Sequence, residues 1–80
     1  IPIRVNDFKA IEAAILKNKQ YEEFGKLAEI SDKYYPKSML SDYHLGMMYE
    51  NMGEFKKAAK AYQKAYQKQD IGNLTKDMMQ

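Results

Sequence analysis

The chain has 80 residues, no cysteine, one histidine and a formal net charge of +2. The lack of cysteine excludes a disulfide framework and a cysteine-ligated zinc site, and a single histidine excludes a histidine-rich metal site. The small net charge does not by itself indicate a nucleic-acid partner. The longest stretch without Asp, Glu, Lys or Arg is Tyr43–Tyr49, far short of the roughly 20 apolar residues of a membrane span. We therefore expect a small domain with no bound metal, no cofactor and no membrane-spanning segment.

Apolar residues recur every three or four positions, which predicts helices and not strands. The first predicted helix follows a cap at Asn6 or Asp7 and ends at the polar turn 17–20. The second, which includes Tyr21, ends near Tyr34, because Pro36 disfavours the helical conformation in the residue before it. Short polar turns of this kind predict antiparallel neighbouring helices.

Two more helices follow. Ser38 or Ser41 can cap the third, and Gly53 is the type of residue that ends a helix in the left-handed conformation. The fourth helix runs from Phe55 to the region of Gly72. A short last helix at about 73–80 completes an all-α fold.

The first helical pair repeats as the second when the sequence is displaced by 34 residues. Most apolar positions stay apolar under this displacement. Gly46 and Ala58 are small where the third and fourth helices are expected to cross, and large residues would force these helices apart. The first pair lacks this feature, since Glu12 and Phe24 occupy the matching positions.

A 34-residue helix–turn–helix period is that of the tetratricopeptide repeat, and Met39–Gly72 resembles this family. The positions that carry the resemblance, and that it assigns to packing within the repeat, are Leu45, Gly46, Tyr49, Gly53, Phe55, Ala58, Tyr62 and Ala65. The upstream stretch Val5–Ser38 matches less well. The sequence departs from the family pattern at Asp42, where an aromatic residue is usual, and at Asp70, where proline is usual.

The resemblance implies one domain over residues 1–80. It contains two tetratricopeptide-like repeats, at about 5–38 and 39–72, and a short capping helix at about 73–80. Placed on this repeat, Tyr49, Tyr62 and Tyr66 are expected in the core, and Met48 and Met52 in the core or between the repeats.

Proteins of this family present a concave face of stacked first helices to a partner, so the resemblance implies protein–protein interaction. The groove positions that it predicts are Lys9, Ala13, Lys17, Leu40, Tyr43, His44, Met47, Glu50 and Asn51. They do not reproduce the carboxylate clamp known in the family. The partner, a protein or peptide, is not indicated by the sequence.

His44 has a second interpretation, which we favour on the sequence alone: a partly exposed histidine with a local hydrogen bond. The serines do not indicate catalysis either. Ser31, Ser38 and Ser41 lie at helix ends or within a helical pattern, where capping and local hydrogen bonds account for them. Without a nucleophile elbow or a phosphate-binding loop, this chain alone is not expected to be an enzyme.

Three alternatives remain open. Three segments, Ile1–Asp7, Tyr35–Leu40 and Thr75–Asp77, resemble parts of the helical tail of some bacterial α/β-hydrolase-type esterases. This resemblance would make the chain a non-catalytic appendage of a soluble cytoplasmic or periplasmic bacterial enzyme, with the catalytic residues upstream. A lysine stripe between Lys56 and Lys68 could bind nucleic acid, although we favour its interpretation as the solvated outer face of the fourth helix. Two repeats also leave one end of the stack open, which predicts self-association or contact with more chain.

Overall fold

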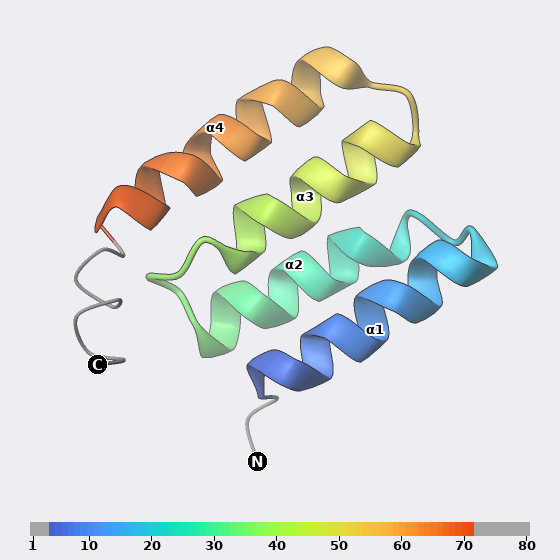
Figure 1. Ribbon diagram of the computed structural model, residues 1–80, viewed down its shortest axis with the longest axis horizontal. Helices are drawn as coiled ribbons and strands as arrows, with labels where there is room; N and C mark the ends of the chain where they lie inside the picture. Colours follow the sequence, from blue (N-terminus) through green and yellow to red (C-terminus); the bar gives the residue numbers. More distant parts are fainter. Residues whose placement is uncertain (1–3, 72–80) are drawn as a thin grey trace.

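The computed structural model describes residues 4–71 as four α-helices joined by short turns (Figure 1). The helices are α1 (Val5–Asn18), α2 (Glu23–Tyr34), α3 (Leu40–Asn51) and α4 (Phe55–Ile71). This part of the chain contains no strand, so the predicted all-α fold is confirmed. The helix predicted at 73–80 lies outside the described residues. None of the helices in the described range is long and apolar enough to cross a membrane.

The first two helices start at different residues from those predicted. Val5 is already helical, and the carboxylate of Asp7 accepts a hydrogen bond of 3.1 Å from the backbone N–H of Arg4. Asp7 therefore acts from inside the first turn, where a negative charge also interacts favourably with the helix dipole. α2 begins at Glu23, so Tyr21 lies in the turn before the helix and not in it.

Three predicted boundary signals lie at helix ends. α2 ends at Tyr34, two residues before Pro36. Oγ of Ser38 accepts a hydrogen bond of 3.2 Å from the backbone N–H of Leu40, the first residue of α3. Gly53, in the turn between α3 and α4, has a φ of 81°, a conformation that favours glycine. These residues end or start the helices for the reasons that the sequence suggested.

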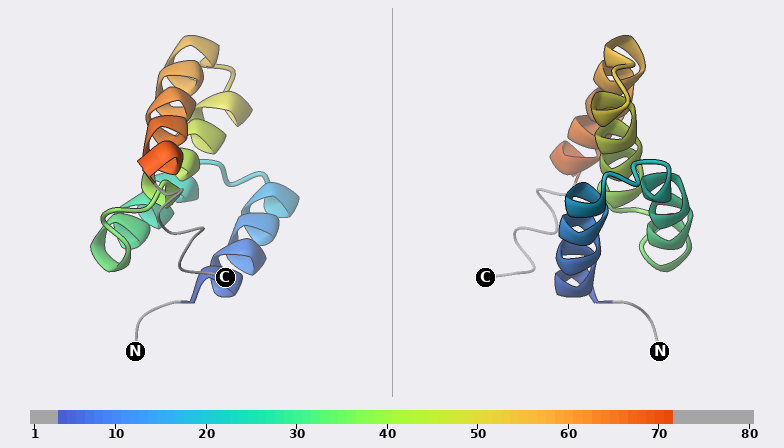
Figure 2. Two further views of the ribbon diagram at one scale, coloured as in Figure 1. Left: turned by 60° about the vertical axis from the view of Figure 1, so that its left-hand side comes forward. Right: turned by 90° about the vertical axis from the view of Figure 1, so that its right-hand side faces the viewer.

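α3 is the central helix of the structure. α2 packs closely along one side of it and α4 along the other, whereas α1 is in much looser contact with α2. Figure 2 shows the same difference, because α1 and α2 diverge while α3 and α4 run together as a close pair. The two hairpins therefore have the same connectivity, but the helices of the first hairpin are further apart than those of the second.

Residue size accounts for this difference. Gly46 and Ala58 are both buried, and a Cβ atom on Gly46 would lie only 2.5 Å from Cε1 of Tyr62. α3 and α4 approach so closely because Gly46 has no side chain. In the first hairpin, Glu12 and Phe24 stand at the matching positions, and side chains of this size keep two helices apart.

The hydrophobic core lies mainly between the first hairpin and α3. Phe8, Ile15, Phe24 and Leu27 form its buried cluster. The half-buried residues that pack against this cluster are Tyr21, Ile30, Tyr35, Leu40, Met47 and Met48. Where α4 meets α3, the buried side chains are instead alanines, namely Ala58, Ala61 and Ala65. The second hairpin is thus packed through close approach of its two backbones, whereas the first hairpin supplies the large apolar side chains of the core.

Three residues that the sequence assigns to packing are largely exposed. Phe55 and Tyr66 are each 68% exposed, and Met52 is 49% exposed, so their predicted place in the core is wrong. The alanine side of α4 faces α3 together with Tyr62, whereas the adjoining apolar side that carries Phe55 and Tyr66 does not. The other expected packing residues, Leu45, Tyr49 and Tyr62, are half-buried.

Candidate functional site

The apolar groove residues predicted on α3 share one side of that helix. Leu40, Tyr43 and Met47 follow each other at spacings of three and four residues. Leu40 and Met47 pack in part on the buried cluster, and the ring of Tyr43 lies 6.0 Å from that of His44 and 6.1 Å from that of Tyr62, between centroids. All three α3 side chains are half-buried, so each keeps some surface for a partner.

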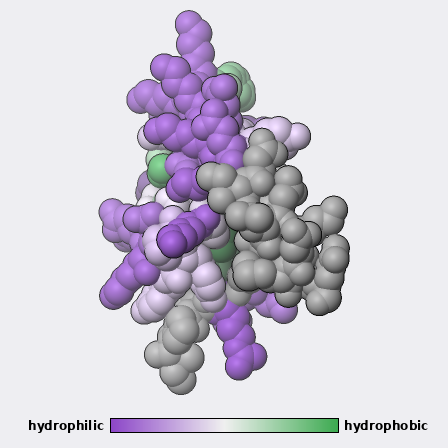
Figure 3. Space-filling view, turned by 90° about the vertical axis from the view of Figure 1, so that its left-hand side faces the viewer, coloured by the Kyte–Doolittle hydropathy of each residue, from purple (hydrophilic) through white to green (hydrophobic). Residues whose placement is uncertain are grey.

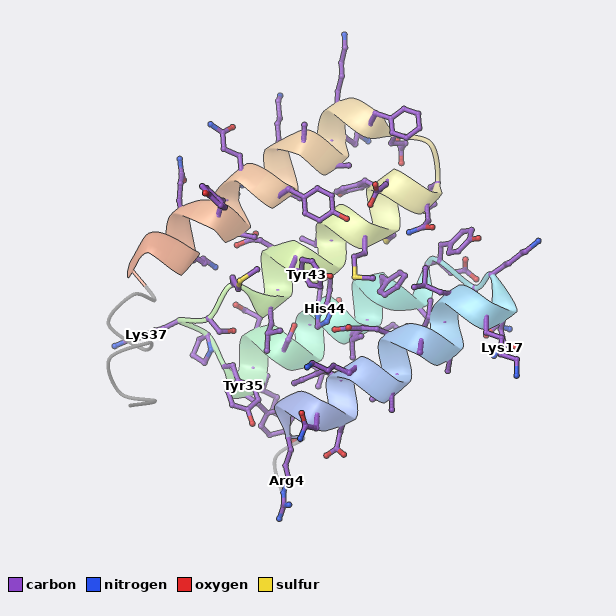
Figure 4. All side chains as sticks on the ribbon, viewed as in Figure 1. Arg4, Lys17, Tyr35, Lys37, Tyr43 and His44 are labelled. Atoms are coloured by element: carbon purple, nitrogen blue, oxygen red, sulfur yellow. The ribbon has the colours of Figure 1, made fainter. Side chains whose placement is uncertain are left out.

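The α1 residues of the predicted groove do not all lie together. Lys9 and Ala13 are exposed and lie within one helical turn of Glu12, whose carboxylate reaches α3. Lys17 is also exposed, but it lies at the far end of α1 and its side chain points away from Tyr43 (Figure 4). Lys9 and Ala13 therefore lie near the point where α1 is linked to α3, and Lys17 does not.

Two polar residues of the predicted groove have partners within the chain. The carboxylate of Glu50 accepts a hydrogen bond of 2.7 Å from the hydroxyl of Tyr62. The amide of Asn51 donates one of 2.7 Å to the backbone carbonyl of Met47. Burial raises the pKa of Tyr62 well above its usual value, and the Glu50 carboxylate raises it further. A ligand that used Glu50 or Asn51 would have to share or replace these bonds.

His44 has no exposed surface, which makes the prediction of a partly exposed histidine wrong. Its Nδ1 lies 3.1 Å from Oγ of Ser31 in α2, and its Nε2 lies 2.5 Å from a carboxylate oxygen of Glu12 in α1. Its ring also packs against that of Phe8, with 5.5 Å between centroids. These partners are distant in sequence. The buried ring leaves no surface for contact with a groove ligand in this structure.

Glu12, His44 and Ser31 form a buried polar cluster that joins three helices. Nε2–H of His44 donates to the Glu12 carboxylate, and the Glu12 side chain is 15% exposed. The Ser31 hydroxyl lies 2.9 Å from the carbonyl oxygen of Leu27 as well as beside Nδ1 of His44. Because the backbones of α1 and α3 do not approach closely, the Glu12–His44 pair is a direct side-chain link between them.

A serine, a histidine and a carboxylate in this order also make up the catalytic triad of hydrolases. A triad serine must present its Oγ to the substrate carbonyl. Ser31 is fully buried, and its hydroxyl faces carbonyl groups of its own helix. We therefore interpret the cluster as a structural connection. Among the side chains that the structure describes, no group of three or more acidic, histidine or cysteine residues is arranged to hold a metal ion.

The sequence analysis missed this cluster, although one signal for it is present. Glu12 is a carboxylate on the apolar side of α1, one turn after Phe8 and one turn before Ile15. A charged group at such a position needs a partner when the helix packs. The partner could not be named, because His44 lies 32 residues away and only the fold brings it to Glu12.

No protein-family model matches the sequence, and no curated protein or solved structure matches it either. The resemblance to tetratricopeptide repeats therefore stays a prediction. Its basis is the 34-residue period and the residues that carry it, together with an all-helical structure that is compatible with such a repeat.

Proposed function

We propose that this chain is a protein-interaction module that binds a peptide, a helix or a neighbouring domain in the groove between α1 and α3. The observation that carries the proposal is the half-buried pair Tyr43 and Met47 on the groove face of α3. The ring of Tyr43 and the thioether of Met47 pack partly within the chain and partly face solvent. A partner's apolar side chains can therefore be buried against them. Lys9 and Glu50, both exposed, set the charge at the edges.

The buried cluster supports the same proposal, because it links α1 and α3, the two helices between which the partner would bind. α1 has few close contacts of its own, and the Glu12–His44 pair holds it in place relative to α3. Helices that are held in place before binding avoid the entropic cost of ordering them when the partner arrives.

The proposal is tested with a peptide selected from a displayed random library for binding to the whole chain. We expect Tyr43→Ala to weaken binding of that peptide by about tenfold or more, because aromatic anchors dominate such interfaces. Tyr34→Ala is the matched control, since it removes another partly exposed tyrosine at the end of α2. Its affinity should stay at the wild-type value. Circular dichroism shows whether both variants keep their helices, and undiminished binding by a folded Tyr43→Ala variant would rule out this groove.

A second candidate function is that of a non-catalytic appendage, which orients or pairs a larger enzyme such as an esterase. The exposed Phe55 and Tyr66 on α4 favour it, because large exposed aromatic residues on one helix are typical of a surface that another domain or a second copy covers. This role and groove binding are compatible, since they use different helices.

A further inference from the structure

A second groove lies on the opposite side of α3 from Tyr43 and Met47. Its floor includes Asp42, Leu45 and Tyr49, which share the other face of that helix. Two adjoining hollows of about 590 Å³ and about 220 Å³ make up this groove, and both are lined by Asp42 and Leu45. We call it the rear groove.

Small residues flank the floor of the rear groove. Gly25 and Ala28 of α2 lie along one side, and Ala61 of α4 lies along the other. α2 and α4 lie on either side of α3 and form the two walls of the rear groove. Both walls run in the same direction, antiparallel to α3 (Figure 1).

The two walls carry opposite charge. The acidic residues of the α2 wall are Glu22, Glu29 and Asp32, with one lysine, Lys26, among them. The α4 wall is entirely basic, and its residues are Lys57, Lys60, Lys64 and Lys68. Hydrophilic side chains also cover the upper part of the view in Figure 3, the height at which α4 lies in Figure 1.

Ion pairs within the chain neutralise only the ends of the basic wall. Lys57 lies 3.2 Å from Glu54, and Lys68 lies 2.8 Å from Asp42. Lys60 and Lys64, in the middle of the wall, form no ion pair with any described residue. Lys60 and Lys64, beside Leu45 and Tyr49 of the floor, are thus left for a partner.

We propose that the rear groove binds an amphipathic helix of a partner protein that is basic along one edge and acidic along the other. The basic edge faces the α2 wall, the acidic edge faces Lys60 and Lys64, and apolar side chains enter over Leu45 and Tyr49. A trough between two parallel helices is shaped for a helix. The floor from Asp42 to Tyr49 is about 10 Å long at 1.5 Å per residue, so it takes two turns of the partner. This proposal does not depend on the groove between α1 and α3.

Three synthetic helical peptides with the same leucine stripe test the proposal by fluorescence anisotropy with the whole chain. One has a lysine edge and a glutamate edge, one has glutamate on both edges, and one has lysine on both. A peptide in which the lysine and glutamate edges are exchanged is not a control. When it binds in the reverse direction, its lysine edge again faces the α2 wall and its glutamate edge the α4 wall. We expect the mixed peptide to bind at least about tenfold more tightly than either of the others, and added salt to reduce this difference.

Two double charge reversals, which change the net charge by the same amount, locate the site. Lys60→Glu/Lys64→Glu should weaken binding of the mixed peptide by about tenfold and shift the preference to the peptide with two lysine edges. Lys19→Glu/Lys37→Glu, at two exposed lysines in the turns after α1 and α2, should leave both affinity and preference unchanged. Equal binding of the three peptides, absence of binding, or equal weakening in both variants would overturn the proposal. Circular dichroism confirms that each variant is folded.

Discussion

Replacing His44 with alanine is expected to lower the free energy of unfolding by about 3 kcal/mol or more. The change leaves the Glu12 carboxylate, only 15% exposed, without its partner, and it removes the ring that Phe8 contacts. A domain of this size has a total stability of about 4–12 kcal/mol. The loss is therefore a large fraction of the whole, and urea denaturation followed by circular dichroism measures it.

A double-mutant cycle separates the link between α1 and α3 from the cavity that the substitution leaves. Glu12→Ala and His44→Ala each break the same pair. The free energy of unfolding lost in the double variant should therefore be about 1–3 kcal/mol smaller than the sum of the two single losses. A coupling energy near zero would mean that the pair does not hold α1 in place. Replacing both residues with leucine should cost less than either single alanine change, because no buried polar group is then left unpaired.

Gly46→Ala is the second substitution with a large expected effect. The new Cβ atom would lie 2.5 Å from Cε1 and 2.6 Å from Cδ1 of Tyr62, so the ring must move and its hydrogen bond to Glu50 is disturbed. Overpacking of this kind costs about 1–3 kcal/mol, and the better helix propensity of alanine offsets about 1 kcal/mol of it. We expect a net destabilisation, measured as a lower urea midpoint at an unchanged slope.

Gly25→Ala is the matched control for this substitution. Gly25 also lies within a helix, and a Cβ atom there would be 3.4 Å from Sδ of Met48, whose flexible side chain can yield. The same chemical change should therefore leave stability unchanged or raise it by up to about 1 kcal/mol. If Gly46→Ala were as stable as Gly25→Ala, then close approach of α3 and α4 at Gly46 would not be what the second hairpin depends on.

The sequence predicts the helices well because their signals are local. The ends at Tyr34 and Gly53 follow from a nearby proline and from a backbone conformation that favours glycine. The looser packing of α1 on α2 also follows from sequence, since Glu12 and Phe24 replace the small pair Gly46 and Ala58. These features depend on residues within one helix or one hairpin.

The features that the sequence does not predict depend on tertiary neighbours. Phe55 and Tyr66 lie beside an alanine stripe on α4, and periodicity alone does not decide which of two adjoining stripes faces α3. Likewise, Glu12, His44 and Ser31 come from three helices, so no spacing in the chain connects them. The rear groove arises from Gly25, Ala28 and Ala61 only because the fold brings α2 and α4 to either side of α3.

The most direct test of the account maps the bound, library-selected peptide on the ¹⁵N-labelled chain by NMR. The groove between α1 and α3 predicts the largest chemical-shift changes at the amides of Ala13, Tyr43 and Met47, with small changes at Lys60 and Lys64 on the rear groove. A footprint that is confined to α4 or to the rear groove, and leaves Tyr43 and Met47 unchanged, would contradict the proposal that this protein binds its partner between α1 and α3.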